Sequence, residues 1–461
     1  MPVPATASPA PPRGDAALVR AIGPAGATLL VIGNVIGSAI FLTSGVMAAE
    51  LGSLSALLLA WVAGGALTVA GGLTFAEMGA MLPRSGGLYV FLEQAYGRLW
   101  GFLFGWTALL VTLTGAVAAV AVGFAEYFSY FVPGLGAGRV VVSAGPLQIN
   151  ATGVVAAASI VALAGVNYVG VQVASRVQGL LTVLKVLGLV AIPLLALAWH
   201  PATPRFDPVV PPVPAPWAAF GVAMIAVMWA FDGWYYLAFS AGEVRNPGRT
   251  LPRAFISGTL ALTGIYLAVN LGYAFALGLD GMAGQVRVAE RAMSALAGPG
   301  GATFIALTVC LSTLGCNVAG TIGMSRACFA MASDGLFFRS AAAVHPVYRT
   351  PHVAIVLTCA WSALLALSGA YDRLFTYVTF ASVLFNMLAG LAIFRLRVTH
   401  PALPRPYRTW GYPYVPLLFV GGSALLVLNT LLERPVESLL GLGLVALGLP
   451  AYRHWVRTAH A

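Results

Sequence analysis

The chain has 461 residues, of which 59% are hydrophobic and only 8% are charged. Soluble domains of this size do not have such a composition, so the sequence predicts a polytopic membrane protein. The formal net charge of +10 would suit a nucleic-acid-binding protein, but the placement of the charge argues against nucleic acid as a partner. If the N-terminus is inside, the outer loops contain only six of the 23 arginines: Arg139, Arg205, Arg287, Arg291, Arg373 and Arg434. This positive-inside bias predicts that both termini are cytoplasmic.

Twelve apolar segments have the length of membrane-spanning helices, whereas the strands of a membrane barrel would be shorter and alternating. The predicted fold class is therefore an all-α membrane protein. Residues 1–21 are rich in proline and alanine, and we expect a disordered cytoplasmic tail there rather than a cleaved signal peptide. Residues 453–461 are expected to form a cytoplasmic C-terminal tail. The segments lie at 22–44, 54–81, 99–131, 150–170, 173–199, 217–241, 254–277, 302–327, 351–370, 372–395, 412–432 and 436–452.

The first apolar segment is interrupted at bilayer depth by the stretch Gly33-Asn34-Val35-Ile36-Gly37-Ser38-Ala39-Ile40-Phe41. Membrane helices tolerate unwound backbone only where it is buried in protein or faces a water-filled cavity. A break would place the N–H groups of one helix end beside the C=O groups of another, and such a gap suits a zwitterion. The alternative at this point is a kinked but continuous helix whose glycines pack against a neighbour.

The second segment is followed by a Pro–Gly–Gly cluster at Pro83–Leu88, and then by the apolar residues Tyr89–Tyr96. The cluster predicts a turn and an in-plane or re-entrant helix on the cytoplasmic side. That helix is either part of an inner gate or a structural corner.

The fifth segment contains Lys185, the only lysine in the chain. Because apolar sequence extends several helical turns to either side, this side chain cannot readily reach an interface by snorkelling. A charge at that depth is costly without partners, so a functional role is the default expectation. The alternative is a lysine that only holds two helices together.

The sixth segment has a second interruption of polar residues and glycine, Trp229-Ala230-Phe231-Asp232-Gly233-Trp234-Tyr235-Tyr236. Gly37 lies 15 residues after Ile22, and Gly233 lies 16 residues after Trp217. Two interruptions at matching depth predict broken helices rather than packing glycines. They also predict a five-plus-five inverted repeat, with its site at the membrane midplane. The repeats would cover residues 22–199 and 217–395, with two further helices in residues 412–452.

Several stretches, in the order in which they occur, resemble the amino acid–polyamine–organocation superfamily, and most closely its L-type amino acid transporter branch. The resemblance implies a LeuT-type fold with ten core helices in two inverted repeats, helices 1 and 6 discontinuous, and two extra helices at the C-terminus. The glycine motifs have little specificity singly, but together they cover residues of about 30 to 355. The matching stretches are Ile36–Phe41, Pro83–Tyr89, Lys185, Phe231–Trp234, Gly242–Pro252, Arg326–Gly335 and His345–Pro351.

The resemblance implies a substrate site made by the two breaks. The substrate carboxylate would bind the backbone N–H groups of Ser38, Ala39 and Ile40. The substrate ammonium would meet carbonyl groups near the ends of both broken helices, and Trp229 would cover the bound substrate as an outer gate. The residues implied for this site are Val35, Ile36, Ser38, Ala39, Ile40, Trp229, Phe231 and Gly233.

The resemblance also implies that Lys185 replaces the sodium ion of sodium-coupled relatives. Its ammonium would reach the carbonyl of Gly33 and the hydroxyl of Ser312 or Thr313, and so tie the first helix to the eighth. The residues themselves leave open whether the hydroxyls near Ser312 bond a neighbouring helix or their own backbone.

Two departures from the family pattern affect the predicted function. The usual glycine after the motif serine is Ala39 here, and the added methyl would narrow the pocket or shift the carboxylate. Animal members bind a helper glycoprotein through a cysteine in the loop after the third helix. Residues 132–149 contain no cysteine, so no disulfide-linked ancillary subunit is expected.

The predicted function is alternating-access transport of neutral L-α-amino acids across the inner (plasma) membrane, without a cofactor or a metal. Sodium-independent exchange is favoured over facilitated diffusion and proton symport. Asp232 either caps the broken sixth helix or faces a cationic side chain, and the second reading would fit a cationic amino acid or polyamine carrier. An enzyme is disfavoured because no His/Cys/Asp cluster lies at one depth. A channel is disfavoured because the chain has no repeated selectivity sequence.

Overall fold

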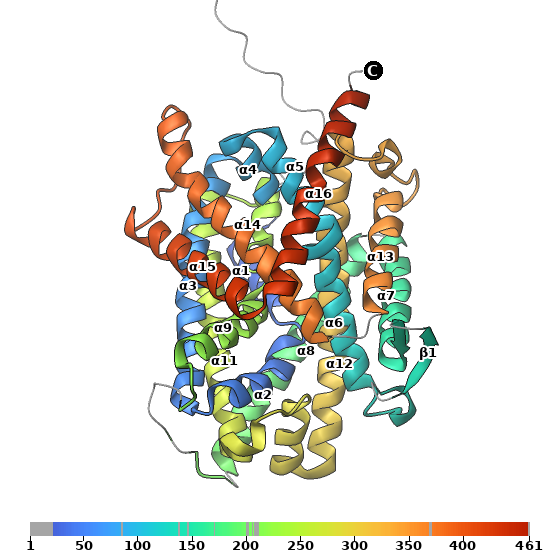
Figure 1. The fold of residues 1–461 in the computed structure, drawn as a ribbon, viewed down its shortest axis with the longest axis vertical. Helices are drawn as coiled ribbons and strands as arrows, with labels where there is room; N and C mark the ends of the chain where they lie inside the picture. Colours follow the sequence, from blue (N-terminus) through green and yellow to red (C-terminus); the bar gives the residue numbers. More distant parts are fainter. Residues whose placement is uncertain are drawn as a thin grey trace, which may run out of the picture.

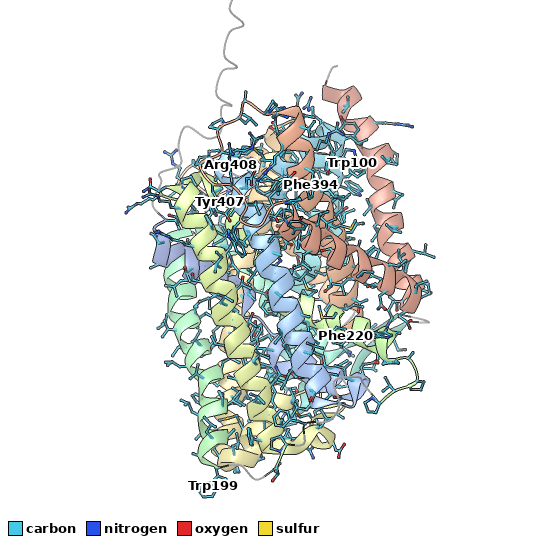
Figure 2. All side chains as sticks on the ribbon, turned by 90° about the vertical axis from the view of Figure 1, so that its left-hand side faces the viewer. Trp100, Trp199, Phe220, Phe394, Tyr407 and Arg408 are labelled. Carbon is cyan, nitrogen blue, oxygen red and sulfur yellow. The ribbon has the colours of Figure 1, made fainter. Side chains whose placement is uncertain are left out.

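The computed structural model describes residues 22–83, 86–136, 139–144, 147–169, 171–199, 202–204, 206, 212–367 and 371–459. The predicted tail at residues 1–21 lies outside the described residues. The described chain forms a tight bundle of helices, many of which run along its longest axis (Figure 1). Trp100, Tyr407 and Arg408 lie near one end of the bundle, and Trp199 lies at the opposite end (Figure 2).

The first half of the chain forms eight helices and a small hairpin. Pro24 opens the first helix, where its missing N–H group costs nothing. Ser53 caps the third by accepting a hydrogen bond from the Ala56 N–H at 3.2 Å. The elements are α1 (Pro24–Val35), α2 (Ala39–Leu51), α3 (Leu54–Met81), α4 (Leu88–Tyr96), α5 (Arg98–Thr107), the π-helical turn η2 (Ala108–Thr112), α6 (Leu113–Phe128), the 3₁₀ turn η3 (Pro133–Leu135), β1 (Val140–Ala144), β2 (Leu147–Asn150), α7 (Ala151–Val169) and α8 (Val171–Ala198).

The second half contains the two longest helices, α11 and α12. Both bend at a glycine with positive φ: Gly278 at +68° in α11 and Gly298 at +64° in α12. The elements are α9 (Pro216–Phe231), α10 (Tyr236–Phe239), the 3₁₀ turn η4 (Ala241–Glu243), α11 (Pro247–Met282), α12 (Val288–Ser333), the 3₁₀ turn η5 (Arg339–Ala342), α13 (His352–Ala366), α14 (Tyr371–Thr399), α15 (Tyr414–Glu433) and α16 (Pro435–Ala459).

The helices lie where the sequence places apolar segments. Within the described residues, nine helices are long and apolar enough to cross a membrane, and α1 and α2 together form a tenth such unit, bent by 51°. Two shorter apolar helices, α9 and α13, have 16 and 15 residues. The chain is therefore a multi-pass membrane protein.

Several details differ from the sequence prediction, such as the start of α12 at Val288 rather than at residue 302. The fold is not purely helical, because β1 pairs antiparallel with β2 in the segment between α6 and α7. The run of valines at Val140–Val142 favours this hairpin, since β-branched side chains suit strands better than helices. In addition, α16 continues to Ala459, whereas the sequence predicts that the last span ends at Tyr452.

Glycines allow α3 and α11 to pack closely. A Cβ atom on Gly65 would lie 2.3 Å from the Thr263 hydroxyl oxygen, and one on Gly72 would lie 2.9 Å from the Phe255 Cβ. At the periphery, only 22% of the most apolar 18-residue stretch of α15 and 17% of that of α16 is buried, against 83% for Arg98–Phe128. The outer faces of α15 and α16 are therefore suited to contact lipid.

A buried ion cluster joins the ends of α3 and α14. Glu77 is fully buried, and its carboxylate accepts hydrogen bonds from Arg397 Nε at 3.0 Å and Nη2 at 2.7 Å. The Thr409 N–H donates to the same carboxylate at 2.6 Å, and Arg405 Nε lies 3.8 Å from it. The guanidinium of Arg397 also lies 3.6 Å from the ring centroid of Tyr412. The cluster therefore fixes the 400–413 segment against α3.

Candidate functional site

The chain is non-helical at both positions where the sequence predicts a break, and the two breaks touch. α1 ends at Val35 and α2 begins at Ala39, with a bend of 51° between them. α9 ends at Phe231, and the chain turns before the short α10 begins. Gly233 in this turn has φ +91°, and a Cβ atom there would lie 3.0 Å from the Asn34 carbonyl oxygen. Glycine is therefore needed here both for its conformation and for the close approach of the two backbones.

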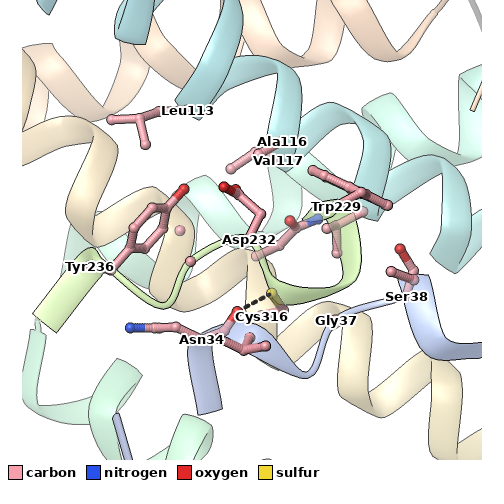
Figure 3. A pocket seen from close by; sticks show the side chains of 16 residues that line it. Asn34, Gly37, Ser38, Leu113, Ala116, Val117, Trp229, Asp232, Tyr236 and Cys316 are labelled. Atoms are coloured by element: carbon pink, nitrogen blue, oxygen red, sulfur yellow. Dashed lines mark hydrogen bonds between the residues drawn. The ribbon is translucent and has the colours of Figure 1, made fainter. Parts of the chain in front are cut away.

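A cavity lies between the breaks and two further helices, α6 and α12. Its volume is about 500 Å³, including space open to solvent. In Figure 3, side chains of α6 close one side of the cavity, and Cys316 with the first break closes the opposite side. The lining residues are Asn34, Val35, Gly37, Ser38, Ala39, Leu113, Ala116, Val117, Val120, Trp229, Asp232, Gly233, Tyr236, Cys316, Asn317 and Gly320.

The cavity brings together five of the eight residues predicted for the substrate site: Val35, Ser38, Ala39, Trp229 and Gly233. The other three, Ile36, Ile40 and Phe231, are fully buried and are not part of the lining. Phe231 instead packs edge-on against the ring of Tyr266, with centroids 5.4 Å apart.

Lys185 binds the unwound end of α1. Its Nζ donates to the Gly33 carbonyl at 2.7 Å and to the Ile36 carbonyl at 2.6 Å, and the residue is only 2% exposed. The carbonyl groups at a helix C-terminus carry partial negative charge, so an ammonium is favoured there. The contact to Gly33 is the one that the family resemblance implies, and the contact to Ile36 is additional.

The two hydroxyls predicted to join this contact behave differently. Ser312 donates to the Ile36 and Gly37 carbonyls over long distances of 3.5 Å each, and thus shares an acceptor with Lys185. Thr313 donates to Val309 and Cys310 in its own helix, at 2.8 Å and 3.0 Å. Thr313 therefore matches the alternative, in which the hydroxyl bonds the backbone of its own helix.

Tyrosines satisfy several carbonyls at the breaks, and sequence reasoning missed them. The Tyr266 hydroxyl donates to the Ala230 carbonyl at 3.1 Å and to the Val35 carbonyl at 3.5 Å, so it joins the two breaks. The Tyr273 hydroxyl donates to the Ile40 carbonyl at 3.3 Å. The two tyrosines are seven residues apart in α11 and thus share one helix face, a spacing visible in the sequence.

Asp232 has a structural contact and also faces the cavity. Its N–H donates to the Trp229 carbonyl at 3.1 Å and closes the last turn of α9. Its carboxyl group interacts with the backbone N–H of Gly233 and the side chain of Tyr235, and it also lines the cavity. Both sequence interpretations of this residue therefore match part of its environment.

One face of α6 forms the apolar wall of the cavity. Leu113, Ala116, Val117 and Val120 line it, at a spacing that marks a single helix face. The π-helical turn η2 directly precedes this wall, and the Leu110 carbonyl within it accepts a hydrogen bond from the Trp361 indole at 3.0 Å. This spacing is visible in the sequence, but the sequence analysis did not assign this helix face to the site.

Comparisons with known proteins match almost the whole chain. The sequence model of a family described as "Amino acid permease" matches residues 22–439. The chain is 32% identical to the "Serine/threonine exchanger SteT" of Bacillus subtilis, over 95% of this chain and 97% of that protein. It is 29% identical to the human "Large neutral amino acids transporter small subunit 2" over 95% and 81%, respectively. It is 28% identical to the human "b(0,+)-type amino acid transporter 1" over 88% and 81%.

Proposed function

Since this chain belongs to the amino acid permease family, within the amino acid–polyamine–organocation superfamily, we propose that it exchanges neutral L-α-amino acids across the membrane without sodium. Its relatives are named as amino acid transporters and exchangers, and amino acid transport is thus the general function of the chain. The neutral substrates, the exchange mode and the independence of sodium are the specific content of the proposal.

The proposal rests on one observation: two helix ends of opposite polarity meet at one cavity. α2 begins at Ala39, and the first N–H groups of a helix have no acceptor within that helix. The carboxylate of the substrate binds there, at the N–H groups of Ser38, Ala39 and Ile40. Its ammonium binds at the carbonyl ends of α1 and α9, near Val35 and Trp229.

Lys185 supplies the reason for independence of sodium. Its ammonium donates to the Gly33 and Ile36 carbonyls, where a bound cation would otherwise hold the unwound end of α1 in place. Because this charge is part of the chain, no dissolved cation is needed to stabilise the break. The cycle then proceeds by exchange, in which bound substrate allows the cavity to reorient.

The arrangement of the spans completes the proposal. Twelve spans form two inverted repeats of five and a final pair, and both termini are cytoplasmic. The arginine distribution and the matching breaks of α1 and α9 support this arrangement. Because residues 132–149 contain no cysteine, the carrier acts without a disulfide-linked partner.

Counterflow in proteoliposomes tests the function. Vesicles preloaded with an unlabelled neutral amino acid should take up a labelled one, and empty vesicles should not. Lys185→Ala should reduce this uptake at least tenfold, because it removes both bonds to the end of α1. Arg434→Ala is the matched control, since it removes a cation from an exposed site after α15 and should leave uptake unchanged. Wild-type vesicles that take up no α-amino acid would disprove the proposal.

A cationic amino acid or polyamine carrier is the second candidate, because Asp232 lines the cavity. A polyamine has no carboxylate and cannot use the N–H groups at the start of α2. Competition assays with L-lysine, with cadaverine, which is its decarboxylation product, and with L-alanine distinguish the candidates. Strong inhibition by cadaverine would favour the polyamine carrier, whereas inhibition by L-alanine alone would favour the neutral exchanger.

A further inference from the structure

Asn317 is a buried polar residue that the proposed function does not yet use. It lies in α12, directly after Cys316, and only 2% of its surface is exposed. Within the described part of the chain, its Nδ2 group is buried and has no hydrogen-bond partner. A buried N–H donor without a partner is costly, and it calls for a specific explanation. Because Asn317 also lines the cavity, a bound substrate is a candidate partner.

The environment of Asn317 indicates what kind of side chain would satisfy it. The α6 wall opposite the first break is apolar, so it accepts the carbon atoms of a substrate side chain. Asp232 supplies a carboxyl group in the same lining. A hydroxyl group is unusual in that it accepts and donates at once, so it can bond an amide N–H and a carboxylate together. A carboxylate side chain on the substrate would instead be repelled by Asp232.

We propose that Asn317 is a specificity-determining residue, and that its Nδ2 group donates a hydrogen bond to the side-chain hydroxyl of a small hydroxylated amino acid such as serine or threonine. This inference deepens the proposed function and rests on it. A substrate that lacks the oxygen leaves Nδ2 buried and unpaired, so the site discriminates against it. Sites that provide a hydrogen-bond donor reject analogues without the acceptor more strongly than apolar pockets reject extra groups.

Two substrate pairs that differ in a side-chain hydroxyl test the assignment: L-serine with L-alanine, and the isosteric pair L-threonine with L-valine. The measured quantity is the ratio of kcat/KM within each pair, from counterflow in proteoliposomes. The wild type should prefer the hydroxylated member of both pairs by about five- to tenfold, which is the factor that one net hydrogen bond contributes. Asn317→Leu should bring both ratios close to one, because leucine keeps the branching at Cγ but removes the donor.

The control variant is Asn167→Leu, the same substitution at a buried asparagine in α7 that does not line the cavity. Asn167 donates to the Leu163 carbonyl of its own helix at 3.0 Å, so its loss should leave both ratios at the wild-type values. Asn317→Ala gives the same test if the leucine variant does not fold. The ratios of the wild type alone also test the assignment of Asn317, since equal rates for serine and alanine would overturn it.

The possible failures are distinguishable. If the wild type exchanges no α-amino acid, the proposed function itself is wrong. If it exchanges amino acids but Asn317→Leu and Asn317→Ala keep the wild-type ratios, only the role of Asn317 is overturned.

Discussion

Replacement of Glu77 by glutamine tests whether the buried ion cluster fixes the 400–413 segment. The carboxylate accepts two hydrogen bonds from Arg397 and one from the Thr409 N–H. Glutamine keeps one oxygen acceptor, so at the Oε2 position it would lose the bond from Arg397 Nε and keep the other two without their charge assistance. Each charge-assisted bond contributes about 1.5 to 3 kcal/mol. Arg397 has 23% of its side chain exposed, and water therefore recovers part of that loss. We expect Glu77→Gln to lower the free energy of unfolding by about 3 kcal/mol.

Thermal unfolding in detergent, followed by intrinsic fluorescence, measures this effect. Glu77→Gln should lower the melting temperature by about 5 °C. The control is Glu290→Gln, which breaks the pair with Arg287 at 3.5 Å, a partly exposed pair at the start of α12. Such pairs contribute less than about 1 kcal/mol. Transport per folded molecule should stay within about threefold of wild type, since Glu77 does not line the cavity.

A double-mutant cycle with Arg397→Met decides whether the two residues are coupled. If the carboxylate and the guanidinium stabilise each other, the double variant should lose less stability than the sum of the single variants. Strict additivity would contradict the reasoning, and so would a Glu77→Gln variant as stable as Glu290→Gln.

Three further predictions concern the breaks, a loop and the coupling ion. Gly233→Ala should reduce counterflow at least tenfold, because a methyl is strained both by φ +91° and by the 3.0 Å approach to the Asn34 carbonyl oxygen. Gly264→Ala, where a Cβ atom would have nothing within 4 Å, should not reduce counterflow. Equal activity of the two variants would contradict this prediction. His345→Ala should speed hydrogen–deuterium exchange of the Tyr348 amide, which donates to His345 Nδ1 at 3.1 Å; unchanged exchange would count against that bond. Replacement of sodium by choline should leave counterflow unchanged, and a drop of more than twofold would refute the role of Lys185.

The positions of the helices and of the breaks could be predicted because each depends on a local signal. A run of apolar residues long enough to cross a bilayer predicts a helix without knowledge of its neighbours. The breaks also have a local signature, since glycine beside asparagine or aspartate occurs at matching depth in the first and sixth segments. The contact of Lys185 with Gly33 was predictable only through the family resemblance, because nothing in the spacing relates residues so far apart.

The remaining features depend on pairings between distant segments. Tyr266 satisfies carbonyls in two different helices, and Glu77 finds its partner 320 residues later in the chain. No periodicity connects such residues. The resemblance located the break and assigned the Phe231 backbone carbonyl to the substrate ammonium, which stays a prediction, but it did not give the direction of the side chain. Phe231 packs against Tyr266 rather than lining the cavity.

The attachment of Lys185 to the backbone has a thermodynamic consequence. An ion taken from solution can drive uphill transport, because it dissolves again on the far side and its gradient does work in every cycle. A side-chain ammonium returns with the protein in every cycle, so it carries no net charge across the membrane. It therefore adds no driving force. Under the proposed exchange, the steepest accumulation of one amino acid is therefore set by the inside-to-outside ratio of the amino acid that leaves in return.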